Sequence, residues 1–179
     1  MAKTLKIVII GCSICMLGIH CKRKSNPFDE MEKETLEDKI IWSDNKKLRW
    51  TDYKYDSTQT SFTIYTKVGL SVRYNVERPI LFRSHTTFST TESTVSDTTH
   101  LDDLRIGQAK FDLLETYRRK MEEEVDSIRN FENPNITKEV FDNMVARFYN
   151  EFEDEWDSFR PITLESLKEV EAAIKRRLN

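Results

Sequence analysis

Three stretches in the second half of the chain carry apolar residues at helical spacing. The first runs from about Leu101 to Asn130, the second begins near Thr137 and ends before Pro161, and the third follows Thr163, a residue type that suits a helix N-cap. An apolar stripe of this period is buried against another element in a folded protein, because water disfavours a continuous apolar surface. The sequence therefore predicts about three helices that pack against a further layer.

The residues before these helices alternate between apolar and polar side chains, which is typical of half-buried strands. One long strand is predicted over residues 62–74, with a bend near Gly69, and a second over residues 80–88, after a break at Pro79. Long strands that lie this close in the sequence favour an antiparallel pair. The predicted fold class is α+β, with a small antiparallel β-sheet followed by about three helices.

The N-terminus has the composition of an export signal. Lys3 and Lys6 precede an apolar run over residues 7–19, which is shorter than the ~20 apolar residues that a membrane-spanning helix needs. We expect residues 1–21 to form a signal peptide or an N-terminal membrane anchor. The protein is then an exported component of the bacterial cell envelope, membrane-anchored or periplasmic, with the membrane as a partner through its N-terminus.

All three cysteines of the chain lie in this first segment. Cys12 follows Ile-Ile-Gly, which resembles a bacterial lipoprotein cleavage box, and Cys21 has a longer apolar lead-in. Both are candidate lipidation sites, and lipidation, simple cleavage and an uncleaved anchor all stay open. The rest of the chain has no thiol with which to build a disulfide framework or a thiolate metal site.

Residues 22–38 are rich in charge and poor in apolar side chains, which predicts a flexible charged linker. Residues 39–179 have the length and apolar content of a single domain with one core. The formal net charge is −3, and basic residues alternate with acidic ones along the predicted helices. This pattern lacks the basic stripe of a nucleic-acid-binding protein, so no nucleic-acid partner is expected.

The stretch from Leu104 to Lys120 has the layout of a helix built around a His-Glu-x-x-His zinc site. In such a site two imidazoles four residues apart share one metal ion, and the glutamate acts as general base. Ile106 and Lys110 stand at the histidine positions here, and Gly107 stands at the glutamate position. A hydrocarbon, an ammonium group and a bare backbone offer no electron pair to a metal ion. We therefore expect no metal, no cofactor and no catalytic residue at this degenerate site.

This helix and two earlier motifs resemble a bacterial family of exported proteins, a domain-of-unknown-function family described as candidate zinc-dependent proteases. The first motif, from Trp42 to Tyr53, is similar to the family's opening Trp…Leu-x-Trp-x-Asp-Phe pattern, and the strand pair follows it. The third lies on the helix itself, where matching residues stand in place at Gln108, Phe111, Asp112, Glu115 and Tyr117. The resemblance spans roughly residues 40–125 and implies a degenerate, zincin-like protease domain.

The resemblance also implies an old substrate cleft beside this helix. Its candidate retained residues are Gln108, Asp112, Glu115 and Tyr117. The leading hypothesis is a catalytically inactive protease-like domain that binds a peptide or protein partner in that cleft. The alternatives are an active, protease-like hydrolase with non-standard catalytic residues and a purely structural envelope lipoprotein.

The sequence leaves the roles of the substituted positions open. Lys110 either brings an ammonium to the place of the lost metal, where it neutralises carboxylates, or is an exposed lysine. Gly107 either reflects a position freed from chemical constraint or makes room for a close neighbour, at a cost on the order of 1 kcal/mol in helix propensity. His85 and His100 are interpreted as separate surface histidines, because nothing in their spacing indicates a relocated metal pair.

Overall fold

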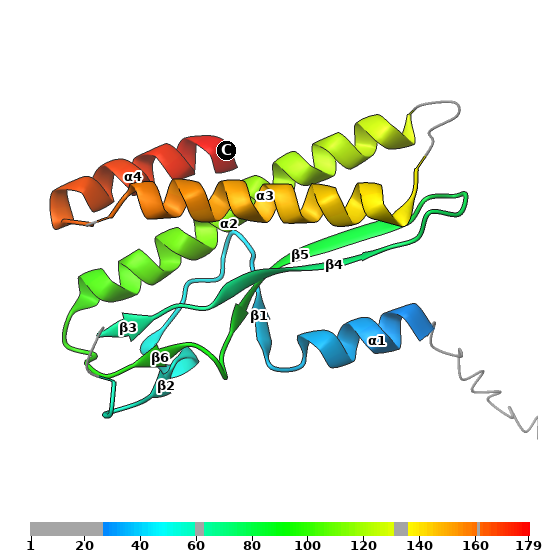
Figure 1. Cartoon of the computed structure of the whole chain (residues 1–179). Coiled ribbons are helices and arrows are strands. Elements are labelled where there is room, and N and C mark those ends of the chain that lie inside the picture. The colour runs from blue at the N-terminus through cyan, green and yellow to red at the C-terminus, as the bar shows by residue number, and fades with distance from the viewer. Residues whose placement is uncertain (1–26, 60–62, 131–135, 161) are drawn as a thin grey trace, which may run out of the picture.

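The layers of the fold follow the predicted order of strands and then helices. The computed structural model describes residues 27–59, 63–130, 136–160 and 162–179. Within these ranges a helical layer covers one face of a small antiparallel sheet, and a short second sheet lies beside it (Figure 1). The α+β class is therefore confirmed.

The main sheet has the strand order β1-β5-β4, with every neighbouring pair antiparallel. The predicted hairpin forms its larger part, and its register runs from Val68 opposite Phe88 to Tyr74 opposite Phe82. The bounds of the three strands are Lys39–Ile41 for β1, Val68–Tyr74 for β4 and Phe82–Ser89 for β5.

The second sheet corrects the prediction of one long bent strand over residues 62–74. That stretch holds two strands, because the chain leaves one sheet and enters the other at Lys67, whose backbone N–H donates to Ser93 Oγ at 3.0 Å. Alternation of apolar and polar residues does not reveal such a change of sheet, since both strands keep the same period. The strand order is β2-β6-β3, with bounds of Lys54–Tyr55, Thr94–Val95 and Ile64–Tyr65.

Three helices build the other layer, close to their predicted limits. Helix α2 packs on β4 and β5, and the helices α3 and α4 pack on α2. Helix α4 begins as predicted, because Thr163 Oγ1 accepts a hydrogen bond from the backbone N–H of Ser166 at 3.2 Å. The bounds are Leu101–Arg129 for α2, Lys138–Ser158 for α3 and Leu164–Leu178 for α4.

Helix α2 is the centre of the core. Between Phe111 and Tyr117 it buries side chains around most of its circumference, because the sheet covers one side and two helices cover the others. Phe88 of β5 links it to the first motif, with ring centroids 6.2 Å from Phe111 and 4.9 Å from Tyr53. The motif from Trp42 to Tyr53, which includes the short 3-10 helix Trp50–Asp52, thus packs against the domain's central helix.

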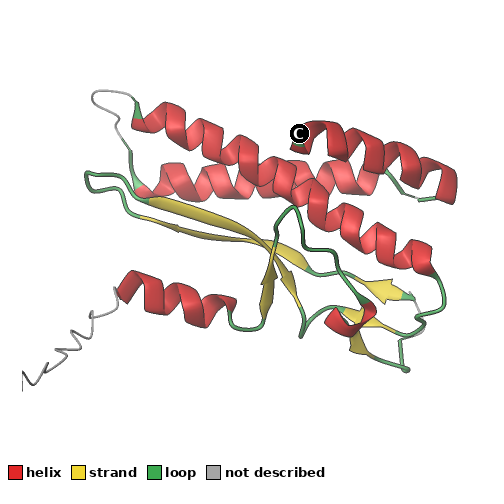
Figure 2. Ribbon diagram, turned by 180° about the vertical axis from the view of Figure 1, so that it is seen from behind, coloured by secondary structure: helices red, strands yellow, loops and turns green. Residues whose placement is uncertain are grey.

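Helix α1, Pro27–Leu36, replaces most of the predicted flexible linker. It lies against the face of the β4–β5 hairpin opposite the other helices (Figures 1 and 2). Side chains alternate across β5, so Arg83 and His85 face α1, where Glu32 accepts from both at 2.9 Å. A low apolar content predicted a mobile tether, but salt bridges to a distant strand hold this segment in place.

None of the helices in the described ranges is long and apolar enough to cross a membrane. The predicted signal segment over residues 1–21, with Cys12 and Cys21, lies outside the described residues, as does the start of the predicted linker.

Candidate functional site

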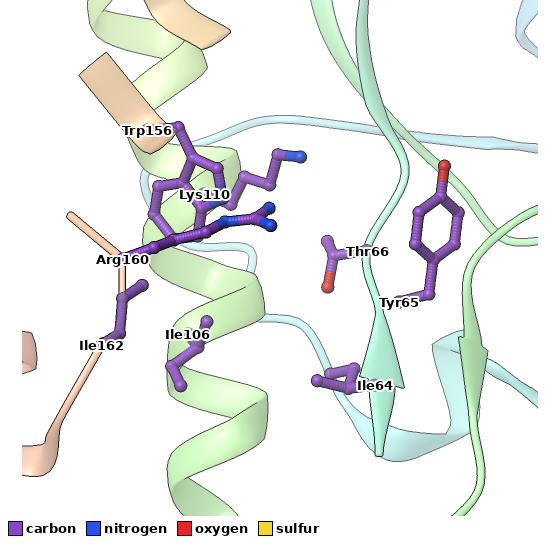
Figure 3. A pocket seen from close by; sticks show the side chains of 8 residues that line it. All are labelled: Ile64, Tyr65, Thr66, Ile106, Lys110, Trp156, Arg160 and Ile162. Atoms are coloured by element: carbon purple, nitrogen blue, oxygen red, sulfur yellow. The ribbon is translucent and has the colours of Figure 1, made fainter. Parts of the chain in front are cut away.

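A pocket of about 600 Å³ lies between α2, β3 and the end of α3 (Figure 3). Ile106 and Lys110 both line it, because side chains four residues apart share one face of a helix. The two positions at which a zinc site would hold histidines therefore face a common cavity. Its lining residues are Ile64, Tyr65, Thr66, Ile106, Lys110, Trp156, Arg160 and Ile162.

Sequence patterns did not indicate the part of the lining that the end of α3 and the residues after it contribute. Trp156 belongs to the buried stripe of α3, and its helical spacing indicated a core residue. Arg160 and Ile162 flank the break at Pro161, where no periodic pattern assigns a direction to a side chain. Their place in the pocket follows from the turn between α3 and α4, which long-range packing determines.

Lys110 is not an exposed lysine, since only 15% of its side chain is accessible. Its Nζ lies 3.8 Å from Glu153 Oε1 and 5.9 Å from the ring centroids of Phe152 and Trp156. Burial lowers the pKa of Lys110 below its ordinary value, and the nearby Glu153 carboxylate only partly offsets that effect. The fold therefore holds this cation in a place where its charge is poorly solvated.

Gly107 makes room for a close neighbour. A Cβ atom at this position would lie 2.2 Å from the hydroxyl of Tyr53 and 2.9 Å from Thr66 Oγ1. These two hydroxyls are themselves 3.1 Å apart and hydrogen-bonded. The position that holds the general base in a zinc protease is thus occupied by a buried tyrosine hydroxyl, and the second of the two interpretations of this glycine is confirmed.

Gln108 and Asp112 do not line this pocket but anchor the first motif to α2. Gln108 Oε1 accepts from the backbone N–H of Leu48 at 2.7 Å, and its Nε2 donates to Asp112 Oδ1 at 2.7 Å. Trp42 Nε1 donates to the same Asp112 oxygen at 2.7 Å. Both residues border a separate hollow next to α4, so the structure gives them a bridging role away from the degenerate positions.

Glu115 is the centre of a buried ion pair and not a free acid in the pocket. Its carboxylate is 2% exposed and accepts from Thr86 Oγ1 at 2.9 Å, from Arg118 Nε and Nη2 at 2.7 Å, and from Arg119 Nε at 3.0 Å. Burial acts to raise the pKa of Glu115, but the hydrogen bonds from the two arginines and Thr86 outweigh it and lower the pKa. This residue stays ionised and joins α2 to β5.

Tyr117 links the three helices of the main layer. Its buried hydroxyl donates to the carboxylate of Glu155 on α3, which also accepts from Arg177 of α4 at 2.7 and 2.8 Å. Burial, together with the Glu155 carboxylate, raises the pKa of Tyr117. None of the four candidate cleft residues lines the pocket: Gln108, Asp112 and Glu115 lie on other faces of α2, and Tyr117 lies two turns beyond Lys110 on the same face.

The two histidines of the domain lie with different partners. His85 Nε2 is 2.9 Å from Glu32 of α1, and His100 Nε2, at the N-cap of α2, is 3.5 Å from Asp97. Among the residues that the structure describes, no group of three or more histidine, cysteine, aspartate or glutamate side chains is placed to hold a metal ion.

Comparison of the chain with protein-family models, with curated proteins and with solved structures gives no match. The resemblance to exported zinc-protease-like proteins rests on the sequence motifs and stays a prediction.

Proposed function

We propose that this chain is an exported, membrane-tethered envelope protein whose protease-like domain binds a peptide or protein partner without cleaving it. The observation that carries the proposal is the position of Ile106 and Lys110. Both stand where the zinc ligands of the resembled family would be, and both line one pocket of about 600 Å³. If the domain kept its substrate cleft but lost its metal ligands, a pocket should remain at these two positions.

The environment of Lys110 supports a binding role. An apolar residue would fill this partly buried position without the desolvation that lowers the lysine pKa. A residue that lines a cavity and whose pKa is shifted by burial is a candidate for a functional role. A ligand that binds in the pocket and contacts the Lys110 ammonium would explain why a cation lies at this position.

The chemistry of the lining favours binding over hydrolysis. The described residues of the lining include no carboxylate and no imidazole, the Thr66 hydroxyl is paired with Tyr53, and the Lys110 amine contacts Glu153 at 3.8 Å. Peptide hydrolysis needs an activated nucleophile or water and a base within hydrogen-bond reach. Apolar walls with a few polar groups are instead typical of recognition sites.

The partner class follows from the strand that borders the pocket. Within the described residues β3 lies at the edge of its sheet, in the order β2-β6-β3. An extended peptide adds to such an edge through main-chain hydrogen bonds while its side chains enter neighbouring pockets. A peptide or an extended segment of a protein therefore fits this site.

A peptide array tests the binding function. We expect the purified full chain to bind a defined subset of peptides, and Ile106→Asn to abolish that binding. Ile128→Asn is the matched control, because Ile128 is another partly buried isoleucine of α2 that does not line the pocket. Array signals that are absent, or equal in both variants, contradict the proposal. Stoichiometric zinc together with cleavage of the bound peptides would favour the hydrolase.

The tether is tested separately through the cysteines of the N-terminal segment. Cells that express the full chain, Cys12→Ser or Cys21→Ser are labelled with a palmitate analogue and fractionated. Lipid attachment predicts that one substitution removes the label and lowers the membrane fraction. A membrane-bound chain that carries no label points to an uncleaved anchor, and a soluble chain in the culture medium contradicts the tether.

A further inference from the structure

We infer that the pocket receives the C-terminal residue of a peptide, with its carboxylate at Lys110 and Arg160 and an apolar side chain against the isoleucines. This rests on the proposed function and specifies the partner of the same site. The pocket contains a charged part and an apolar part, and each matches one group of such a residue.

The charged part is cationic. The ammonium of Lys110 and the guanidinium of Arg160 both point toward Thr66, across the space between α2 and β3 (Figure 3). Their acidic neighbours, Glu153 and Asp157, do not line the pocket. The cavity therefore presents two positive groups and no negative one among its described lining residues.

The pairs on these cations leave room for a ligand carboxylate. Arg160 Nε lies 3.4 Å from Asp157 Oδ1, with more than half of each side chain exposed, and Lys110 Nζ lies 3.8 Å from Glu153. The exposed pair of Arg160 with Asp157 contributes little to stability, and the Lys110–Glu153 separation is longer than a hydrogen bond. A carboxylate that meets both cations in a partly buried pocket gains charge-assisted hydrogen bonds, which are the stronger kind.

The apolar part lies next to the cations. In Figure 3 the side chains of Ile64, Ile106 and Ile162 lie on one side of the Lys110 and Arg160 head groups. The α-carboxylate and the side chain of a terminal residue diverge from one Cα atom, so they can reach the two parts together. A carboxylate inside a peptide, on aspartate or glutamate, lies at the end of its own side chain and leaves the isoleucines to another residue.

The edge of β3 favours a peptide over a fatty acid with the same two groups. An extended backbone that leaves the pocket can pair with this edge, whereas an alkyl chain has no hydrogen bonds to offer it. Capture of a terminal carboxylate beside an added strand is an established mode of peptide recognition.

The experiment compares free-acid peptides with their C-terminal amides. The full chain is titrated calorimetrically with acetyl-Ala-Ser-Ala-X, where X is Leu, Ile, Val or Phe, in both forms. We expect at least one free acid to bind, and its amide to bind at least tenfold more weakly. Lys110→Gln and Arg160→Gln should each reduce the acid-to-amide ratio, and Lys110→Arg should keep it. Lys168→Gln and Arg176→Gln, at exposed positions of α4, are the matched controls and should leave the ratio unchanged.

The outcomes separate this inference from the proposed function. Equal binding of acids and amides, abolished by Ile106→Asn, overturns the carboxylate inference and leaves peptide binding in place. Binding of laurate without binding of any of the peptides overturns both. Failure of all eight peptides to bind, while array peptides still bind through the pocket, overturns the C-terminal specificity alone. Circular dichroism of each variant verifies that a lost signal does not reflect unfolding.

Discussion

The hydroxyl of Tyr53 occupies the space in which a side chain at Gly107 would begin. A Cβ atom there would be 2.2 Å from that hydroxyl, a separation that no real pair of such atoms adopts. Glycine inside a helix costs about 1 kcal/mol relative to alanine. The absence of a side chain at Gly107 lets α2 and the Tyr53 hydroxyl of the first motif approach each other over the core.

Gly107→Ala should therefore destabilise the protein, although alanine is the better helix former. Overpacking costs roughly 1–3 kcal/mol, and the gain in helix propensity offsets about 1 kcal/mol of it. Urea unfolding should show a lower midpoint for Gly107→Ala. Gly69→Ala is the steric control, because a Cβ at Gly69 would meet its nearest neighbour at 3.8 Å.

The same clash predicts coupling between two positions that are far apart in the sequence. Tyr53→Phe removes the hydroxyl, so Gly107→Ala should cost less in that background than in the wild-type chain. A double-mutant cycle measures the difference. Additive effects would contradict the steric explanation.

Most of the helical layer could be predicted, because the apolar period of a helix is visible within a short stretch of sequence. The hairpin of β4 and β5 was also predictable, since its strands are close in the sequence. Contacts between distant segments could not be predicted. Tyr53 reaches α2 from the first motif, and Glu32 meets His85 across 53 positions, so no pattern within a window reveals either contact.

The motif residues show the same limit in the candidate site. Ile106 and Lys110 were correctly expected to share one face of a helix, because the spacing itself determines that. Glu115 and Asp112 matched a protease motif, yet their partners Thr86 and Trp42 come from distant segments that the spacing does not show. The position of each motif residue on the helix could be predicted, but the contacts of its side chain could not.

Lys110→Met should leave the stability unchanged or raise it. The pKa of Lys110 is lowered in the folded state, so the folded protein binds the proton less tightly than the unfolded chain does. At neutral pH the charge on Lys110 therefore opposes folding. The free energy of unfolding rises as the pH increases from the folded pKa of Lys110 toward the ordinary lysine pKa of 10.5. Methionine removes this opposition while it keeps the packing. Thermal unfolding at pH 7 measures the effect, and a large loss of stability would indicate that the ion pair with Glu153 dominates.

Glu115→Gln should be among the most destabilising substitutions of a polar residue in the domain. It leaves the guanidinium of Arg118, 16% exposed, without its main partner. Loss of one member of a buried pair costs about 3–5 kcal/mol, and the second contact of Arg118, to Glu122 at 2.6 Å, reduces the expected loss to about 2–3 kcal/mol. Chemical unfolding measures it. Glu123→Gln, on the exposed side of α2, is the matched control and should change the stability by less than about 0.5 kcal/mol.

The stability of the wild-type chain should fall in acid partly through Glu115. Its folded pKa is lowered, so the stabilisation is complete above the ordinary value of 4.5 and is lost as the pH falls through the folded value. Urea unfolding between pH 7 and pH 3 should show the wild type losing more stability than Glu115→Gln. The difference in unfolding free energy between the wild type and Glu115→Gln should become smaller only below pH 4.5. A constant difference across this range would mean that the pKa of Glu115 is the same in the folded and the unfolded protein.

A metal site should be recoverable at the two degenerate positions. Ile106→His with Lys110→His would place two imidazoles at helical spacing in the same pocket. Calorimetry should show one Zn²⁺ bound by the double variant and weaker binding by either single variant. Equal binding by the double variant and a single variant would contradict this geometry. The zinc-loaded variant should still cleave no peptide, because the hydroxyl of Tyr53 fills the place where a general base at position 107 would have to stand.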